Sequence, residues 1–244
     1  MQLCFLGTGA SGGIAGRGRS RRRESSLLLQ DDVSILLDTG RDFAAQSEGV
    51  EMLDAVLLTH SHRDACGGVP QLRTWLSERS QGPIDVYASA ATVKVLRRRY
   101  ARLDHCRFVA VGDGERHRIG RWTASALTVP HARDPEQPTF AWKLRDGATA
   151  LVYASDLARL TSALRRFCRG SRLVAIDAAL WGRRLYSHLT IDEALPELCR
   201  WQVERIVLTH IGRSAPAHER LEQEVASLCP RALPAYDGMK LQLD

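Results

Sequence analysis

A short segment, residues 57–68 (LLTHSHRDACGG), places three side chains able to bind a metal at alternate positions. The imidazoles of His60 and His62 are followed by the carboxylate of Asp64. Neutral imidazoles and carboxylates are donors that suit Zn²⁺ or Mn²⁺, and such a cation generates hydroxide near neutral pH. The spacing therefore indicates a metal site that could activate water. The next residue is Ala65, so the series of donors ends there.

Further potential ligands stand where apolar segments of the sequence end. Strand ends of an α/β sheet gather at one edge, which is where such folds place their ligands. A lone histidine after a strand is more often a structural residue, but four such ends together with the alternating donors favour a metal centre. The four apolar segments finish at His60, His131, Asp156 and His210.

Short apolar runs alternate with amphipathic stretches along the chain, which is the pattern of an α/β fold with buried strands. Ten strands are predicted, at residues 3–7, 26–30, 33–38, 54–60, 84–89, 126–131, 140–144, 150–156, 172–177 and 205–210. Four helices are predicted, at residues 69–79, 91–103, 158–169 and 191–201. The last helix follows a capping-box pattern from Thr190 to Glu193, and Pro196 should bend or shorten it. The length predicts a single domain, residues 1–244.

The net charge of +6 favours an anionic partner, although a genome biased toward arginine would produce the same charge. Only Lys94, Lys143 and Lys240 are lysines, which fits such a bias. A predicted loop carries five arginines among glycines: Arg17, Arg19, Arg21, Arg22 and Arg23. This loop is either a solvated surface or a rim that attracts phosphate.

The cysteines and the apolar runs bear on the location of the protein. The six cysteines form no C-x-x-C pair, so we expect reduced thiols rather than a disulfide framework or a cysteine zinc knuckle. No apolar run reaches the roughly 18 residues of a membrane span. The start, MQLCFLGTGASGG, lacks the basic and long apolar regions of a signal peptide. These features predict a cytoplasmic protein with no membrane partner.

Taken together, these residues resemble the metallo-β-lactamase-fold hydrolases. The parts of the family pattern that the chain matches are the H-x-H-x-D segment at residues 60–64, the third histidine at His131, the bridging carboxylate at Asp156, the last histidine at His210 and the early structural aspartate at Asp38. The segments LGTGASGG, YSHLTIDEAL, LTHIG and YDGM are most similar to the small phosphodiesterase branch, which includes the cyclic phosphodiesterase accessory to carbon–phosphorus lyase and ribonuclease Z. The resemblance implies an αββα four-layer sandwich with a metal centre between its sheets.

The resemblance also implies a role for each residue. A first metal would be held by His60, His62 and His131, with Asp156 as the bridge and with Asp64 and His210 at a second metal. Asp64 would orient the attacking water, and His188 corresponds to the proposed general acid of the branch. The alternative interpretation of His188 is a histidine that merely flanks a helix start.

Ala65 departs from the family motif, which has a histidine of the second metal site at this position. Cys66 could replace that histidine, since thiolate binds Zn²⁺, but it stands one position late. The favoured interpretation is one tightly bound Zn²⁺ or Mn²⁺ at an intact first site, and a weakened second site.

The function implied by the resemblance is that of a metal-dependent phosphodiesterase, which acts on a small or cyclic phosphodiester through a metal-activated hydroxide. The chain has no insertion of the size of the tRNA-binding arm of ribonuclease Z, so precursor tRNA is not an expected substrate. Other RNA and a homodimer are left open as partners. The alternatives are a thioester or lactone hydrolase of the same fold, and a catalytically degenerate member that binds RNA or protein.

Overall fold

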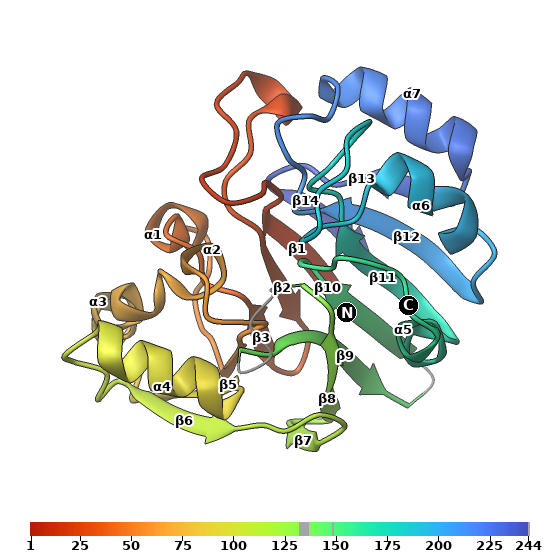
Figure 1. The fold of residues 1–244 in the computed structure, drawn as a ribbon. Helices are drawn as coiled ribbons and strands as arrows, with labels where there is room; N and C mark the ends of the chain where they lie inside the picture. Colours follow the sequence, from red (N-terminus) through yellow and green to blue (C-terminus); the bar gives the residue numbers. More distant parts are fainter. Residues whose placement is uncertain (132–136, 148, 244) are drawn as a thin grey trace.

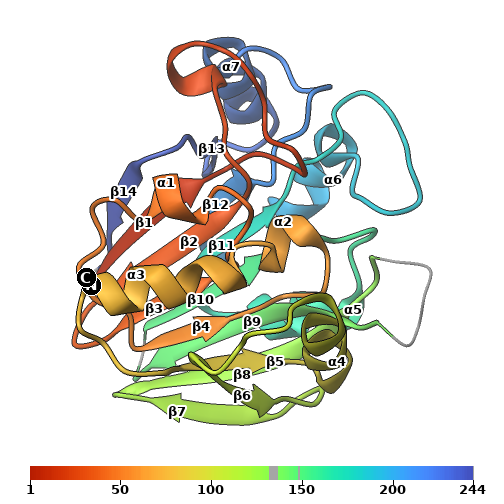
Figure 2. The same ribbon diagram turned by 90° about the vertical axis from the view of Figure 1, so that its left-hand side faces the viewer.

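The computed structural model describes residues 1–131, 137–147 and 149–243. Two seven-stranded sheets pack face to face, and helices cover the outer face of each sheet (Figure 1, Figure 2). The layers therefore run helix, sheet, sheet, helix, which confirms the predicted αββα sandwich. The organisation of residues 1–244 as one domain stays a prediction.

The first sheet is formed by β1 (Gln2–Gly7), β2 (Ser26–Gln30), β3 (Ser34–Leu37), β4 (Ala55–Leu57), β5 (Ile84–Ala88), β6 (Cys106–Ala110) and β14 (Met239–Gln242). Their order is β14-β1-β2-β3-β4-β5-β6. Strands β3 to β6 are parallel, and β2, β1 and β14 extend the sheet by antiparallel pairing. Strands from the two ends of the chain thus pair with each other.

The second sheet is formed by β7 (Arg116–Ile119), β8 (Trp122–Val129), β9 (Thr139–Asp146), β10 (Thr149–Ala154), β11 (Ser171–Asp177), β12 (Val203–Thr209) and β13 (Ala232–Pro234). Their order is β13-β12-β11-β10-β9-β8-β7. Strands β10 to β13 are parallel, and β8 runs in the same direction because it pairs antiparallel with β9, which pairs antiparallel with β10. The carboxyl ends of β8, β10, β11 and β12 therefore meet at one edge of the sheet.

The helices form the two outer layers. The helices that follow strands of the first sheet are α1 (Phe43–Gln46), α2 (Arg63–Cys66), α3 (Leu72–Glu78) and α4 (Ala90–Arg99), and those that cover the second sheet are α5 (Ser162–Cys168), α6 (Ile191–Leu198) and α7 (His218–Leu228). Short 3₁₀ turns lie at Gly18–Ser20 and Val69–Gln71. Within the described ranges, no helix is both long and apolar enough to cross a membrane.

Side-chain caps fix where two of the helices begin. The Ser89 hydroxyl accepts a hydrogen bond of 3.1 Å from the Thr92 amide at the start of α4, and the Thr161 hydroxyl accepts one of 3.1 Å from the Leu164 amide at the start of α5. Each cap satisfies an amide that has no partner inside its helix. The two caps consequently fix the first helical residues at Ala90 and Ser162.

The main core lies between the sheets and contains large aromatic side chains. Trp122, Trp142 and Tyr153 from the second sheet pack there with Phe5 and leucines of the first. Two further apolar clusters lie on the outer faces, one under α1, α3 and α4 and one under α5, α6 and α7. The central strands are thus buried on both faces, which explains why they read as continuous apolar runs.

All ten predicted strands are present, one with the predicted bounds (β2) and nine with shifted bounds, and the four predicted helices are present but shorter. The capping-box prediction is wrong: the Thr190 hydroxyl does not cap α6 but donates a hydrogen bond of 2.9 Å to the Arg183 carbonyl. Pro196 lies inside α6, which ends at Leu198, in agreement with the expected shortening. The elements that were not predicted are β6, β7, β13, β14, α1, α2 and α7.

The prediction of reduced thiols is wrong for two of the six cysteines. Cys199 and Cys229 form a disulfide, with 5.6 Å between their Cα atoms. They directly follow α6 and α7, two helices that contact each other on the second sheet, and this packing places the pair within bonding range. The other four cysteines are free and buried, as expected: Cys4, Cys66, Cys106 and Cys168.

Reduction of this disulfide is expected to lower the free energy of unfolding by about 3 kcal/mol. The bond links residues 30 positions apart and so lowers the conformational entropy of the unfolded chain. The measurement is urea unfolding with and without dithiothreitol. Cys199→Ser is the control, since it has no bond to reduce and should not respond to the reductant. Thiol titration in denaturant should find four thiols before reduction and six after it. Six thiols before reduction would contradict the bond.

Candidate metal centre

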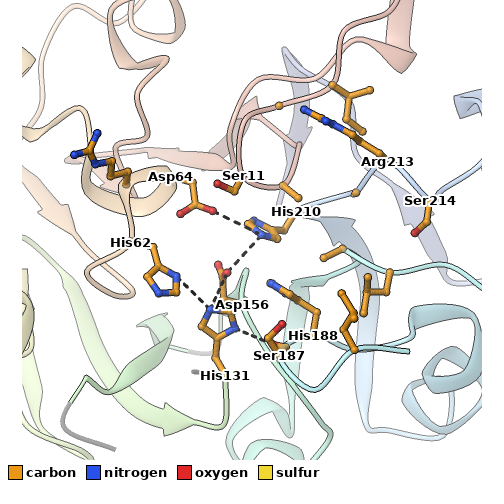
Figure 3. Close-up of a pocket in the computed structure, with 18 of the residues that line it drawn as sticks. Ser11, His62, Asp64, His131, Asp156, Ser187, His188, His210, Arg213 and Ser214 are labelled. Atoms are coloured by element: carbon orange, nitrogen blue, oxygen red, sulfur yellow. Dashed lines mark hydrogen bonds and ion pairs between the residues drawn. The ribbon is translucent and has the colours of Figure 1, made fainter. Parts of the chain in front are cut away.

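The structure brings all six predicted metal ligands together where strand ends meet. His60, His131, Asp156 and His210 follow β4, β8, β10 and β12, whereas His62 and Asp64 lie just before and within α2. Figure 3 shows His62, Asp64, His131, Asp156 and His210 pointing toward one another. Both sheets contribute, because β4 and α2 belong to the first half of the sandwich and the other strands to the second.

The donor atoms of these residues form overlapping groups. Among the described residues, three sets of three donors lie within 4.8 Å of one another. The sets are His60, His62 and His131; Asp64, Asp156 and His210; and His131, Asp156 and His188. The first two match the division into two metal sites that the resemblance implied. The third places His188 within reach of the same space.

Three imidazole rings form the first group. The ring centroids of His60 and His62 lie 4.5 Å apart, and that of His131 lies 5.2 Å from the first and 5.3 Å from the second. The three rings are tilted steeply against one another, so their nitrogens converge instead of stacking. His60 is deeply buried, and desolvation lowers its pKa to about 3. The ring is therefore neutral, which is the form that binds metal.

Contacts behind the rings fix which nitrogen faces the centre. The Ser187 carbonyl accepts a hydrogen bond of 2.8 Å from Nδ1 of His131, and Thr59 Oγ1 lies 2.9 Å from Nδ1 of His60. Both rings are thus left with Nε2 toward the shared space. Nε2 of His60 is buried without a hydrogen-bond partner among the described residues. An orphaned nitrogen of this kind fits a ligand position.

Asp156 stands between the two groups. Its Oδ2 accepts a hydrogen bond of 2.8 Å from the Ser155 hydroxyl, which leaves Oδ1 free to face the imidazoles. Oδ1 lies 3.4 Å from Nε2 of His210, 3.6 Å from Nε2 of His131 and 3.8 Å from Nε2 of His60. Asp64 Oδ2 completes the second group, 3.9 Å from Nε2 of His210.

Asp38 does not belong to the donor groups but contacts residues next to two of the donors. It is buried and accepts hydrogen bonds from the Thr59 amide at 2.8 Å and from the Ser155 hydroxyl at 3.3 Å. It therefore connects the segment that carries His60 with the segment that carries Asp156. Burial raises the pKa of this carboxyl group well above its usual value. Its backbone is left-handed, with φ 60°, a strained conformation for a residue other than glycine.

Cys66 does not face the donors. Its thiol donates to the backbone carbonyls of Ser61 and His62 at 3.3 and 3.1 Å, and its side chain packs in the apolar cluster under α3. Burial raises the pKa of the thiol to about 12, so thiolate is disfavoured. Ala65 is itself buried. Cys66 is consequently in the wrong place to substitute for the missing histidine.

His188 lies beside the centre and is held by a carboxylate. Asp177, fully buried at the end of β11, is 2.7 Å from Nδ1 of His188. The ring of His188 lies 4.8 Å from that of His131, centroid to centroid. Burial lowers the pKa of His188, but the Asp177 carboxylate outweighs burial and raises this pKa to about 9. The imidazole therefore carries a proton at neutral pH. Asp177 was not predicted, although RLVAID ends in an acid as ALVYASD does.

The donors open into a pocket of about 820 Å³. Four of its lining residues are arginines, which come from separate parts of the chain: Arg63, Arg99, Arg183 and Arg213. None of the four forms an ion pair with a carboxylate in the part of the chain that the structure describes. Uncompensated guanidinium groups around a pocket favour an anionic ligand. These arginines could not be predicted as pocket residues, because no local pattern distinguishes them.

The arginine-rich loop does not form this rim. None of its five arginines lines the pocket. Arg22 is buried and donates hydrogen bonds to the Thr8 hydroxyl and the Ala235 carbonyl. Arg19 forms an ion pair of 3.0 Å with Glu222 on α7. Two of the loop's arginines thus have structural contacts, and the arginines that line the pocket come from other segments of the chain.

The sandwich fold and its cluster of histidines and aspartates define a metal-binding hydrolase of the metallo-β-lactamase fold. The family model described as the Beta-lactamase superfamily domain matches residues 34–211, and the chain belongs to this superfamily.

The chain is similar to a ribonuclease Z and to a structure of the PhnP family, which agrees with the predicted branch, and also to an octanoyltransferase. A ribonuclease Z from a Bradyrhizobium species is 28% identical over 98% of this chain and 99% of its own length. An octanoyltransferase from Porphyromonas gingivalis is 26% identical over the whole chain, which spans 52% of that relative. The crystal structure of a diphosphatase of the PhnP family superposes with a TM-score of 0.86 at 23% identity, covering 100% of this chain and 98% of the other.

Proposed function

We propose that the protein is a metal-dependent phosphodiesterase acting on a small or cyclic phosphodiester. The observation that carries the proposal is the pocket itself, which is lined by metal donors, by a carboxylate-held histidine and by four arginines that form no ion pair with a carboxylate among the described residues. A phosphodiester carries the negative charge that the arginines would bind. The similarity to a ribonuclease Z and to a diphosphatase, both named for cleavage at phosphate, supports the same substrate class.

The donor set fits a divalent cation. Zn²⁺ or Mn²⁺ would be held at a first site by His60, His62 and His131, with Asp156 shared and with Asp64 and His210 at a second site. The orphaned Nε2 of His60 and the neutral state of that ring agree with this assignment. When bound, such a cation supplies a nucleophile from water near neutral pH and offsets charge on the phosphoryl oxygens.

The side chains around the centre provide the remaining chemistry. Asp64 accepts a hydrogen bond from the attacking water and orients it. His188 donates a proton to the leaving oxygen, and Asp177 holds its ring through Nδ1 so that Nε2 is available to the substrate. Arg213 and Arg63 bind the charged oxygens of the phosphate from the pocket wall.

Acyl hydrolysis is the second candidate function. The similarity to an octanoyltransferase favours it, because that name denotes acyl chemistry. A thioester or lactone is uncharged at the reacting group, however, and leaves the arginines of the pocket without a partner. The third candidate function is the binding of RNA or protein by a catalytically degenerate member of the superfamily.

One set of measurements separates the three functions. The metal content of the purified protein is determined, and turnover is measured with bis(p-nitrophenyl) phosphate, with an acyl thioester and with a lactone. Metal-dependent hydrolysis of the phosphodiester alone is the expected result. Hydrolysis of the thioester or lactone without the phosphodiester would favour the second candidate, and a metal-free, inert protein that binds RNA or a partner protein would favour the third.

The small side chain of Ala65 is expected to limit the number of metals held. A dialysed sample should keep about one metal per chain, because the second site lacks one imidazole and binds mainly through oxygen, which suits Mn²⁺ better than Zn²⁺. Ala65→His should raise the retained metal to about two per chain, and added Mn²⁺ should stimulate the wild type more than the variant. Metal analysis after dialysis is the measurement, with circular dichroism to verify folding. Two tightly held metals in the wild type would refute this view of Ala65.

A further inference from the structure

A second pocket rich in arginine lies where α5 and α6 end. It has a volume of about 350 Å³ and is lined by four arginines and a glutamine: Arg165, Arg166, Arg169, Arg200 and Gln202. None of these five residues lines the pocket at the metal centre. All five are exposed to solvent. This arginine pocket therefore presents four positive charges and one amide to a single small space.

The topology places the arginine pocket at the edge of the second sheet opposite to the metal donors. The donors Asp156 and His210 follow the ends of β10 and β12, whereas the arginine pocket lies beside the starts of β11 and β12. Since β12 has seven residues, with a rise of about 3.3 Å each, the two sites are roughly 20 Å apart. A ligand in the arginine pocket is consequently distinct from one at the metal centre.

The two segments that form the arginine pocket are held together by the backbone. The Gly170 amide, directly after the arginines of α5, donates a hydrogen bond of 2.8 Å to the carbonyl of Gln202. Residues 199–202 in turn connect α6 to β12. The positions of the arginines on the two segments are therefore fixed relative to one another by the fold.

The side chains of the arginine pocket have no polar partner in the part of the chain that the structure describes. None of the five forms a side-chain hydrogen bond, an ion pair or a ring contact there. Helix α5 contains no acidic residue, and Glu204, which follows Gln202 closely, lies 3.6 Å from Arg172 instead. Like charges that share one small space repel one another, and a bound anion would replace this repulsion with attraction.

The end of a helix favours positive charge on its own account, because the last carbonyls carry partial negative charge. At the end of α5 another residue already contacts these carbonyls. Nζ of Lys143 donates hydrogen bonds to the carbonyls of Phe167, at 2.6 Å, and Arg169, at 3.4 Å. The guanidinium groups of Arg165 and Arg166 make no such contact and remain available to a ligand.

We propose that the arginine pocket binds a small anion that carries two neighbouring phosphate groups. Guanidinium groups bind phosphate oxygens through pairs of parallel hydrogen bonds, and arginines on two separate segments can contact two phosphate groups at once. A volume of about 350 Å³ suits a small molecule. The Gln202 amide supplies a further donor. This site does not depend on the proposed phosphodiesterase activity.

Calorimetric titration of the purified protein with methylene bisphosphonate, whose bridging carbon resists hydrolysis, tests the proposal. An ionic strength of about 0.15 M largely screens attraction between charges more than about 8 Å apart. Arg165→Gln/Arg166→Gln is expected to weaken one binding event at least about tenfold, because hydrogen bonds between charged groups are strong. Arg97→Gln/Arg98→Gln is the matched control, since it removes two neighbouring arginines from the last turn of α4. It should change the affinity less than about twofold.

A second double variant separates this event from binding at the metal centre. Arg63→Gln/Arg213→Gln removes two arginines from the pocket at the metal centre and should leave the event at α5 unchanged. Arg165→Gln/Arg166→Gln should hydrolyse bis(p-nitrophenyl) phosphate at the wild-type rate, so the proposed function is tested independently. Circular dichroism verifies that each variant is folded.

Four outcomes would overturn the site, and none of them bears on the proposed function. The first is the absence of any binding event that depends on the arginines of α5. The second is an equal loss in the α4 and α5 variants, which would show a response to net charge alone. The third is loss of all binding in the variant at the metal centre. The fourth is binding of single-stranded RNA, but not of the bisphosphonate, through the arginines of α5, which would show a nucleic-acid surface instead.

Discussion

His62→Ala is expected to lose its tightly bound metal and more than 99% of its phosphodiesterase activity. Loss of an outer-sphere partner of a metal ligand already costs about 10- to 100-fold in affinity or activity, and loss of the ligand itself should cost more. The ring centroids of His60 and His131 lie 4.5 Å and 5.3 Å from that of His62, so the variant removes one of three imidazoles that converge on the first site.

The measurement is metal content after dialysis together with turnover of bis(p-nitrophenyl) phosphate. His117→Ala serves as the matched control, since this histidine lies on β7 against Tyr87 and belongs to none of the donor groups. It should retain both metal and activity. Full metal-dependent activity in His62→Ala would show that the first site is wrongly assigned.

His188→Ala should reduce the hydrolysis of alkyl phosphodiesters by about 10²- to 10⁴-fold, the usual contribution of general acid catalysis. Nitrophenyl esters should suffer much less, because nitrophenolate departs without a proton. Asp177→Asn should show the same dependence on the leaving group with a smaller loss, since it removes the charge that keeps His188 protonated.

Metal content must be measured in parallel, because the donors of His188, His131 and Asp156 lie close enough to bind a cation together. A variant that keeps its metal and loses activity only on alkyl esters supports the role in proton transfer. Equal losses on both kinds of ester, or loss of metal, would assign His188 a positioning or ligand role.

The central strands could be predicted because burial on both faces leaves a continuous run of apolar residues within them, such as LLL in β2 and LVAI in β11. The edge strands could not. Strand β7 reads RHRI with a single buried residue, and β6 reads CRFVA with a single buried residue, so neither has the composition of a core strand. Helix α7 was not predicted, because its sequence is strongly charged and one of its few buried positions is His218.

Most of the donors of the candidate centre could be predicted because they follow apolar strands that the sequence marks clearly. The residues around the centre could not, since tertiary structure alone brings them there. Arg63 and Arg213 stand next to predicted ligands but are indistinguishable from other arginines of the chain. The pairing of Cys199 with Cys229 depends on how α6 packs against α7, which no local pattern records.

The distribution of the centre over both sheets has a consequence for synthesis on the ribosome. The H-x-H-x-D segment is made early, whereas Asp156 and His210 emerge much later, and β1 gains its partner β14 only with residues Met239–Gln242. A nascent chain therefore presents His60, His62 and Asp64 to the metals of the cell before the remaining donors exist. The full donor set, and with it the choice of metal, therefore exists only in the finished fold.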